Sequence, residues 1–240
     1  MYKFDKNKLL FSISISLILI WSGCVDTGVQ SIPDSIVYYS QLKFTNLVVG
    51  AGSYTLTLNG QSIGTVDFGS EAPAGSFIQV QSGSKTLNAS FTGAPSEGYK
   101  FSADTDYKIR VFLIGTAASN ELLKSTQRYI WQTKDSPNGA PLFPPDTGQV
   151  AFFNGSPDAV TSSLQITGGS LDTTITFDTP LAIGDGIPYV MIKAGSYAFD
   201  ITYNDSLHST FNYDVTARSR YTAVMYDSTS SLKNAVFIDD

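Results

Sequence analysis

The chain repeats itself at a spacing of 108 residues, and this repeat limits the available folds more than any other feature of the sequence. Solenoid repeats run about 20 to 50 residues, whereas a unit of about 100 residues is the size of a complete domain. The matching positions are Gln41, Phe44, Asn46, Ala51, Leu56, Leu58 and Gly60 in the first copy, and Gln149, Phe152, Asn154, Ala159, Leu164, Ile166 and Gly168 in the second. The sequence therefore predicts two tandem domains.

The first domain is predicted at residues 36–133 and the second at residues 148–240. Between them, residues 134–147 contain one glycine and four prolines. Prolines stiffen and extend a linker, because each one fixes its own φ angle and has no backbone N–H group. We therefore expect the linker to hold the two domains apart.

Apolar and polar residues alternate within each copy. Tyr54, Leu56 and Leu58 are separated by two threonines, and this period of two residues indicates a strand with one buried face. Turn signals such as Asn59-Gly60 interrupt these segments at intervals of about 8 to 12 residues, as in antiparallel sandwiches and barrels. The sequence therefore predicts an all-β protein, and residues 117–123 are the only segment that we consider for a short helix.

The beginning of the chain has the features of an export signal. Three lysines precede an apolar stretch from Leu9 to Trp21, which is shorter than the roughly 20 residues that cross a bilayer but fits a signal-peptide core. Ser22, Gly23 and Cys24 then resemble the bacterial lipobox, in which the cysteine becomes acylated, although Trp21 stands where that pattern usually has leucine. We predict a signal peptide at residues 1–23, lipidation of Cys24 and a tether at residues 24–35. The alternative is an ordinary secretory signal with an unmodified cysteine.

The composition argues against several classes of protein. The net charge is −6 and the basic residues are not clustered, so binding to nucleic acids is not expected. A single cysteine excludes an intramolecular disulfide bond. The single histidine, His208, lies in a polar segment that is predicted to be a surface hairpin, so a catalytic triad or a zinc site is not expected. We predict no cofactor and no metal.

Acidic residues are the remaining candidates for chemistry. Asp104 and Asp106 form an Asp-x-Asp pair and Asp185 lies between two glycines, so calcium binding stays open, although neither segment has EF-hand spacing and turn formation explains both. A glycosidase needs two carboxylates about 5 to 10 Å apart. The acids near predicted turns of the second copy are Asp158, Asp172, Asp178 and Asp185. Most of their first-copy counterparts are not acidic, so we predict that the protein is not an enzyme.

A group of aromatic residues near the end of the first copy bears on binding. Tyr129, Trp131 and Phe143 are close in sequence. Exposed aromatic rings stack on sugars and anchor protein partners, whereas buried ones fill a core or an interface between domains. We interpret this group as part of the core or of the interface between the two domains.

Three short segments have the form Asp-Ser followed by an aliphatic residue or threonine. They are Asp34-Ser35-Ile36, Asp205-Ser206-Leu207 and Asp227-Ser228-Thr229. The pattern resembles the acceptor sequence for general O-glycosylation in some Gram-negative envelopes. A pattern this short also recurs by chance.

Residues 152–159 read Phe-Phe-Asn-Gly-Ser-Pro-Asp-Ala, and they are followed by Ile166-Thr167-Gly168-Gly169, by Ala194-Gly195-Ser196-Tyr197 and by Tyr221-Thr222-Ala223-Val224. These segments resemble the domain-of-unknown-function 4397 family over most of the second copy. Gly155 replaces the alanine of that family, and the first copy has Val48-Val49-Gly50 where the family has Ser-Pro-Asp. The resemblance implies tandem antiparallel immunoglobulin-like β-sandwich domains, as found on bacterial surfaces, and it implies no particular activity.

The candidate site residues within this motif are Asn154, Ser156, Pro157 and Asp158. Proline presets the φ angle of a turn, and serine and aspartate side chains bind the backbone nearby. Shaping of the loop is therefore our preferred interpretation, and a role in binding is the alternative.

These observations predict a lipoprotein of the cell envelope that is anchored to the outer membrane through its N-terminal lipid. It would face the periplasm or the exterior and act by binding or adhesion, with a protein or a glycan as its partner. The alternatives are a carbohydrate-binding accessory protein of a glycan-uptake system and a structural spacer of the envelope.

Overall fold

The computed structural model describes residues 37–91, 97–117, 122–130, 144–169 and 171–239. Every regular element in these ranges is a β-strand, which confirms the all-β prediction. The described residues contain no helix that could span a membrane. Residues Tyr38–Asp240 form one compact unit. The signal peptide, Cys24, the tether and most of the linker lie outside the described residues. So does the centre of the segment that we considered for a helix, whose last two residues belong to a strand.

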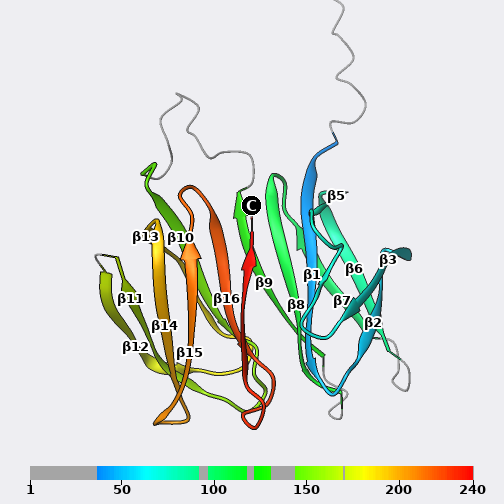
Figure 1. Cartoon of the computed structure of the whole chain (residues 1–240). Helices are drawn as coiled ribbons and strands as arrows, with labels where there is room; N and C mark the ends of the chain where they lie inside the picture. Colours follow the sequence, from blue (N-terminus) through cyan, green and yellow to red (C-terminus); the bar gives the residue numbers. More distant parts are fainter. Residues whose placement is uncertain (1–36, 92–96, 118–121, 131–143, 170, 240) are drawn as a thin grey trace, which may run out of the picture. The chain divides into compact units, whose positions relative to one another are not determined.

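The first half of the compact unit consists of two sheets (Figure 1). One sheet has the strand order β4-β1-β8-β9, with β5 also paired to β1, and the other has the order β3-β2-β6-β7. The strands are β1 (Tyr39–Val49), β2 (Ser53–Leu58), β3 (Gln61–Asp67), β4 (Glu71–Ala72), β5 (Ile78–Gln81), β6 (Gly83–Ser90), β7 (Glu97–Ala103), β8 (Tyr107–Thr116) and β9 (Leu122–Ile130).

The second half has the same arrangement. Its sheets have the orders β13-β10-β16-β17 and β12-β11-β14-β15, so β10 takes the place of β1 and β16 that of β8. The strands are β10 (Thr147–Asn154), β11 (Thr161–Gly168), β12 (Leu171–Leu181), β13 (Gly186–Lys193), β14 (Gly195–Tyr203), β15 (Leu207–Val215), β16 (Arg220–Tyr226) and β17 (Lys233–Ile238). The two halves therefore share one topology.

Each half contains one parallel pair of strands among antiparallel ones. β1 runs parallel to β8, and β10 runs parallel to β16. The prediction of purely antiparallel sheets is wrong at these pairs. The two strands of each parallel pair are separated in sequence by the strands of the other sheet of that half, and this long connection provides the crossover that a parallel pair needs. The strand order also differs from that of an immunoglobulin domain, in which the first, second, fifth and fourth strands form one sheet. In the second half, the first strand pairs with the fourth and the seventh.

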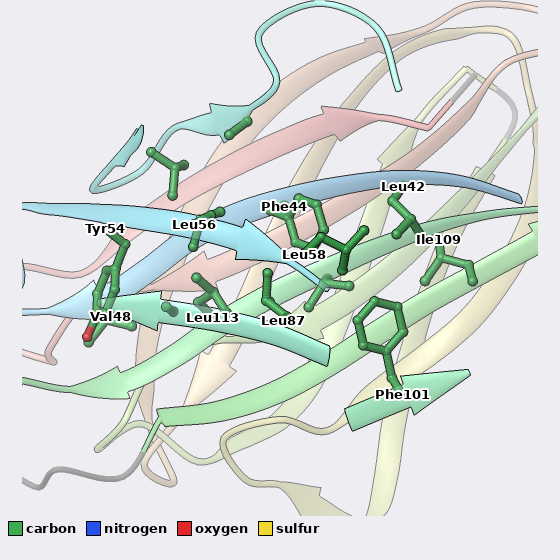
Figure 2. Packing of buried hydrophobic residues seen from close by; sticks show 14 of the residues in the cluster. Leu42, Phe44, Val48, Tyr54, Leu56, Leu58, Leu87, Phe101, Ile109 and Leu113 are labelled. Carbon is green, nitrogen blue, oxygen red and sulfur yellow. The ribbon is translucent and has the colours of Figure 1, made fainter. Parts of the chain in front are cut away.

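Each half encloses a hydrophobic core between its two sheets. In the first half, Phe44 on β1 and Ile109 on β8 face Leu56 on β2, and all three are fully buried (Figure 2). The alternation predicted for residues 54–58 places Tyr54, Leu56 and Leu58 in this core. An equivalent core surrounds Phe152 in the second half. Each half is therefore a β-sandwich with a core of its own.

A third hydrophobic cluster joins the two halves, and we call it the interface cluster. It consists of Leu47, Phe112, Ile114, Phe153, Val224, Tyr226 and Phe237. The rings of Phe112 on β8 and Phe153 on β10 stack with their centroids 4.7 Å apart. β1, β8, β10 and β16 are consequently buried on both faces. The expectation that the linker holds the copies apart is therefore wrong, because the outer faces of these strands are apolar and cover each other.

Candidate functional site

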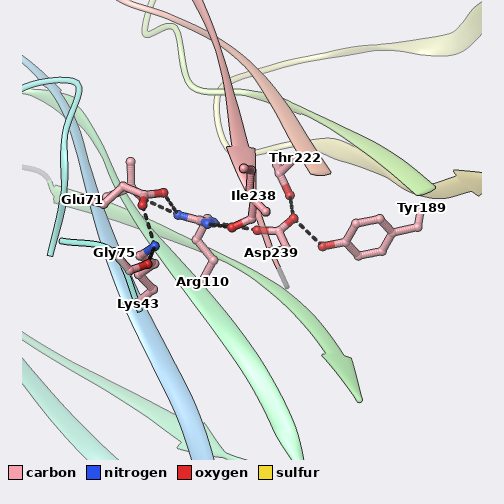
Figure 3. A network of polar contacts seen from close by, with 9 residues as sticks. Lys43, Glu71, Gly75, Arg110, Tyr189, Thr222, Ile238 and Asp239 are labelled. Carbon is pink, nitrogen blue, oxygen red and sulfur yellow. Dashed lines mark hydrogen bonds and ion pairs between the residues drawn. The ribbon is translucent and has the colours of Figure 1, made fainter. Parts of the chain in front are cut away.

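A group of buried and partly buried polar residues continues the interface toward the start of β1 and β8 (Figure 3). We call it the charged interface, and it consists of Lys43, Glu71, Arg110, Tyr189, Thr222 and Asp239. Lys43 and Arg110 are direct neighbours in the β1–β8 register. Side chains alternate along a strand, so the same backbone that turns Phe44 and Ile109 into the core turns Lys43 and Arg110 toward the second half. The strands therefore position both cations.

Arg110 is the centre of the charged interface. Its side chain is fully buried, and its Nε donates to Asp239 Oδ1 at 2.8 Å. Its Nη2 donates to the carbonyl of Ile238 at 2.7 Å, and its Nη1 donates to Thr45 Oγ1 at 3.2 Å and to Glu71. Burial opposes the charge, but the carboxylates of Asp239 and Glu71 outweigh it and raise the pKa of Arg110. Arg110 of the first half thus holds the end of the second.

Asp239 is as deeply buried as Arg110 and is surrounded by hydrogen-bond donors. Thr222 Oγ1 donates to its Oδ2 at 2.7 Å, and the hydroxyl of Tyr189 donates to the same oxygen at 2.8 Å. Burial raises the pKa of Asp239 and also that of Tyr189. The guanidinium of Arg110 stays charged and can only donate, so the form of Asp239 that pairs with it is the carboxylate. We therefore describe Asp239 as ionised at neutral pH and Tyr189 as a neutral donor.

Lys43 and Glu71 form the outer part of the charged interface. Lys43 Nζ lies 2.7 Å from Glu71 Oε2 and donates to the carbonyl of Gly75 at 2.6 Å. It also lies 5.3 Å from the centre of the Phe77 ring, within the range of a cation–π interaction. The side chain of Glu71 keeps 22% of its surface exposed and lines a pocket of ≈ 360 Å³ together with residues 236–238.

The charged interface is suited to joining the two halves. Each of its two carboxylates accepts a hydrogen bond from a cation, and each of its two cations donates to a carboxylate. Carboxylates that are neutralised in this way are poor bases, and neither lysine nor arginine is freed as a nucleophile. Removal of one partner would leave a buried charge without compensation, which costs about 3 to 5 kcal/mol. The arrangement is therefore structural rather than catalytic.

Asn154, a candidate from the sequence, is fully buried and connects three segments of the second half. Its Oδ1 accepts a hydrogen bond from the N–H of Ser156 at 3.0 Å. Its Nδ2 donates to the carbonyls of Ala159 and Leu181, both at 2.8 Å. Asn154 thus fixes the chain where it leaves β10.

Asn46 makes the equivalent contacts in the first half. Its Oδ1 accepts from the N–H of Val48 at 3.0 Å, and its Nδ2 donates to the carbonyls of Gly52 at 3.3 Å and Val66 at 3.2 Å. The repeated asparagine therefore has one structural task near the end of the first strand of each half.

Ser156 and Asp158 connect the loop of residues 155–160 to its surroundings, with Pro157 between them. Ser156 Oγ accepts from the N–H of Ala159 and donates to Asp158 Oδ1, both at 3.2 Å. Asp158 also accepts hydrogen bonds from the N–H of Thr229 at 2.8 Å and from its Oγ1 at 3.0 Å. Each of these contacts shapes the loop or ties it to the loop between β16 and β17.

The structure disperses the other candidates for chemistry. His208 is exposed on β15, and its Nδ1 lies 3.0 Å from Oδ1 of Asp200 on the neighbouring strand β14. Asp104 accepts a hydrogen bond from Ser102 Oγ at 2.8 Å, and Asp185 accepts one from a backbone N–H of its own turn at 3.1 Å. Asp178 is exposed on β12. Across the described ranges, no three residues among His, Cys, Asp and Glu gather as a metal site.

The aromatic group that the sequence suggested for the core or the interface lies largely outside the described residues. Trp131 and Phe143 lie outside the described residues, and Tyr129 belongs to β9, opposite Lys108 on β8. Among the described residues, Phe112, Phe153 and Phe237 contribute aromatic rings to the interface cluster.

A local signal for this interface is present in the sequence. Val111-Phe112-Leu113-Ile114 in β8 and Ala223-Val224-Met225-Tyr226 in β16 are uninterrupted apolar runs. Such runs indicate strands that are covered on both faces, whereas alternation indicates one covered face. These runs would have predicted a second buried surface on each half, although not the polar residues beside it.

Comparison with known proteins gives little further information. No protein-family model and no curated protein matches the chain. The similar solved structures include a candidate cell adhesion protein from Bacteroides uniformis, with 10% identity, 87% of this chain and 99% of that chain covered, and a TM-score of 0.28. They also include the tip fimbrial protein Mfa3 from Porphyromonas gingivalis with a C-terminal truncation (9% identity, 84% and 99% covered, TM-score 0.27). A candidate cell adhesion protein from Bacteroides ovatus is a third (9% identity, 84% and 98% covered, TM-score 0.28). Scores this low establish neither a shared overall fold nor a shared function.

Proposed function

We propose that the protein is a lipid-anchored protein of the cell envelope that acts by non-catalytic binding or adhesion, with its two sandwiches working as one binding body. The charged interface carries this proposal. Its charges are paired with one another, and the Arg110–Asp239 pair joins the two halves, so these groups are not left free to act on a substrate. A body whose parts are fixed to each other holds its exposed loops and edges in place before a partner arrives, which lowers the cost of binding.

The attachment to the membrane is proposed from the sequence. Removal of residues 1–23 would leave Cys24 as the acylated first residue, anchored in the outer membrane, and residues 24–35 would connect it to the sandwiches. Residues 36–133 and 148–240 are proposed to be tandem copies of one domain, and their resemblance to the 4397 family is part of the same proposal. The body would face either the periplasm or the exterior.

The described surface favours a protein over a glycan as the partner. Glycan-binding faces use clustered exposed aromatic rings. The aromatic residues among the exposed large hydrophobic side chains of the described ranges are Tyr38 and Tyr39, at the beginning of the first strand. β15, in contrast, is an edge strand whose nine residues follow β14 without a register shift. Regular edge strands of this kind accept an added strand from a partner protein.

Attachment of intact cells tests the proposal. Cells that produce the full chain, the Cys24→Ala chain or no chain are compared on surfaces coated with a panel of proteins and a panel of glycans, and protease treatment of intact cells reports display of the chain. For cells that display the chain, we expect at least one protein coating to retain severalfold more cells with the full chain than either control. Retention on glycans alone would support the accessory function instead. Equal retention on every coating by cells that display the chain would support a spacer.

A further inference from the structure

One Asp-Ser motif lies at the tip of the hairpin that connects β14 to β15. Asn204 and Asp205 have φ angles of 44° and 70°, the left-handed conformation that tight hairpin turns require. Asp205, Ser206 and Leu207 are all exposed, and Leu207 exposes 49% of its surface. Within the described part of the chain, the Oγ of Ser206 has no hydrogen-bond partner. All three side chains of the motif are therefore accessible to an enzyme.

Asn204 fixes the base of this hairpin tip. Its Oδ1 accepts a hydrogen bond from the N–H of Val160 at 2.9 Å, and its Nδ2 donates to the carbonyl of Asp158 at 3.4 Å. The tip is thus tied to the neighbouring loop at one residue, while Asp205 and Ser206 extend beyond that point. Protruding tips of this kind are the usual places where modifying and cleaving enzymes reach a folded chain.

The second described motif, Asp227-Ser228-Thr229, has the opposite environment. Asp227 is 6% exposed, and its carboxylate contacts Lys233 Nζ at 2.9 Å and the N–H of Ser228 at 2.8 Å. The Oγ of Ser228 lies 3.0 Å from that of Ser230 and 3.1 Å from that of Ser231. Both the acid and the hydroxyl group are engaged in the turn itself. The Asp-Ser pattern is therefore accessible to an enzyme at residues 205–207, whereas its acid and hydroxyl groups are engaged in local contacts at residues 227–229.

We propose that Ser206 is an O-glycosylation site and that Ser228 is not. The sugar donor would be a glycan carried on a lipid diphosphate. In the transfer, Ser206 Oγ bonds to the anomeric carbon of the sugar, and the bond from that carbon to the diphosphate oxygen breaks. The hydroxyl proton passes to a base of the transferase, and the lipid diphosphate is the leaving group. This site rests on the proposed function, because only an exported chain meets such a transferase in the envelope.

Mass spectrometry of the full chain, isolated from the cells that naturally produce it, tests this proposal. Three chains are compared in a Ser35→Ala background, which removes the motif outside the described residues: the parent, Ser206→Ala and Ser228→Ala. The same samples are labelled with an alkyne fatty acid to report lipidation. We expect the parent and Ser228→Ala to carry a glycan mass on the peptide that contains residue 206, and Ser206→Ala to carry none. Ser206 lies at an exposed turn, so alanine there leaves the sandwich unchanged.

The outcomes separate this proposal from the function on which it rests. A lipid-labelled parent chain without a glycan would overturn the glycosylation site alone. A glycan on Ser228, or one that survives Ser206→Ala, would also overturn it. A parent chain that stays in the cytosol without lipid would overturn both the envelope function and the site.

Discussion

Arg110 and Asp239, 129 positions apart in the sequence, form a fully buried ion pair with a distance of 2.8 Å between Nε and Oδ1. The pair connects β8 of the first half to the residue that follows β17 of the second. Taking two charges out of water costs several kcal/mol, which their attraction repays only when the geometry is good. The attraction within the pair therefore repays the desolvation cost in one alignment of the two halves. Other alignments would leave the buried charges unpaired.

Replacement of Arg110 by methionine should lower the free energy of unfolding by about 3 to 5 kcal/mol, because it leaves Asp239 buried without its cation. The double variant Arg110→Met with Asp239→Leu should recover most of this loss, since no buried charge remains. Urea unfolding monitored by circular dichroism measures both. Lys233→Met is the matched control, because Lys233 is half-exposed and Asp227 keeps its hydrogen bond from the N–H of Ser228, so the loss should be much smaller. Equal losses in the single and double variants would show that the pairing is unimportant.

Asn154→Ala should destabilise the protein by about 3 kcal/mol or more. It removes three hydrogen bonds and leaves one N–H and two carbonyls of the backbone without their partner. Asn46→Ala should cost a similar amount, because Asn46 makes the same three contacts in the first half. Urea midpoints of the two variants provide the comparison. A loss below about 1 kcal/mol at either position would contradict the structural task assigned to these residues.

Stability should fall at alkaline pH. Burial raises the pKa of Tyr189 above its ordinary value of 10.0, and burial has the same effect on Tyr213 and Tyr226. The folded state holds these phenolic protons more tightly than the unfolded state. Their contribution to the free energy of unfolding is therefore complete below about pH 10 and is lost as the pH rises further. Tyr189→Phe removes one such group. The free energy of unfolding of this variant should lie below that of the natural chain at about pH 9. The difference between the two chains should shrink by about 1 kcal/mol between about pH 9 and pH 11. Parallel stability profiles would disprove this contribution.

Cys24→Ala should abolish metabolic labelling by an alkyne fatty acid and release the protein from the membrane fraction. The cysteine is the only residue of the lipobox-like segment that can carry the thioether-linked lipid, and without acyl chains no stable anchor remains. Gel fluorescence and cell fractionation measure the two effects. Labelling that persists in the variant would place the lipid elsewhere or show that the signal is an ordinary secretory one.

The repeat in the sequence anticipated the duplicated topology because the matched residues have the same task in both halves. Asn46 and Asn154 show this most clearly, since both are buried and both bind one N–H and two carbonyls. The strand order was not accessible in the same way. Alternation in residues 54–58 indicates which face of a strand is buried, but it does not indicate that β1 lies beside β8.

The interface between the halves was harder to predict for a different physical reason. No sequence pattern near Arg110 or Asp239 indicates that the two residues pair, because the contact depends on how two complete sandwiches meet. The apolar run of residues 111–114 does indicate a second buried face on β8. The identity of the surface that covers it, including Phe153, follows only from the folded chain.

We conclude that the two sandwiches form one body, and hydrogen exchange in the Leu56→Ala variant examines this claim. Leu56 is fully buried in the core of the first half, so the substitution should cost about 2 to 5 kcal/mol there. If the interface couples the halves, amides of β14 in the second half should lose the same opening free energy as amides of β6 in the first. If β6 alone exchanges faster and β14 keeps its original protection, the two halves are independent and the claim is wrong.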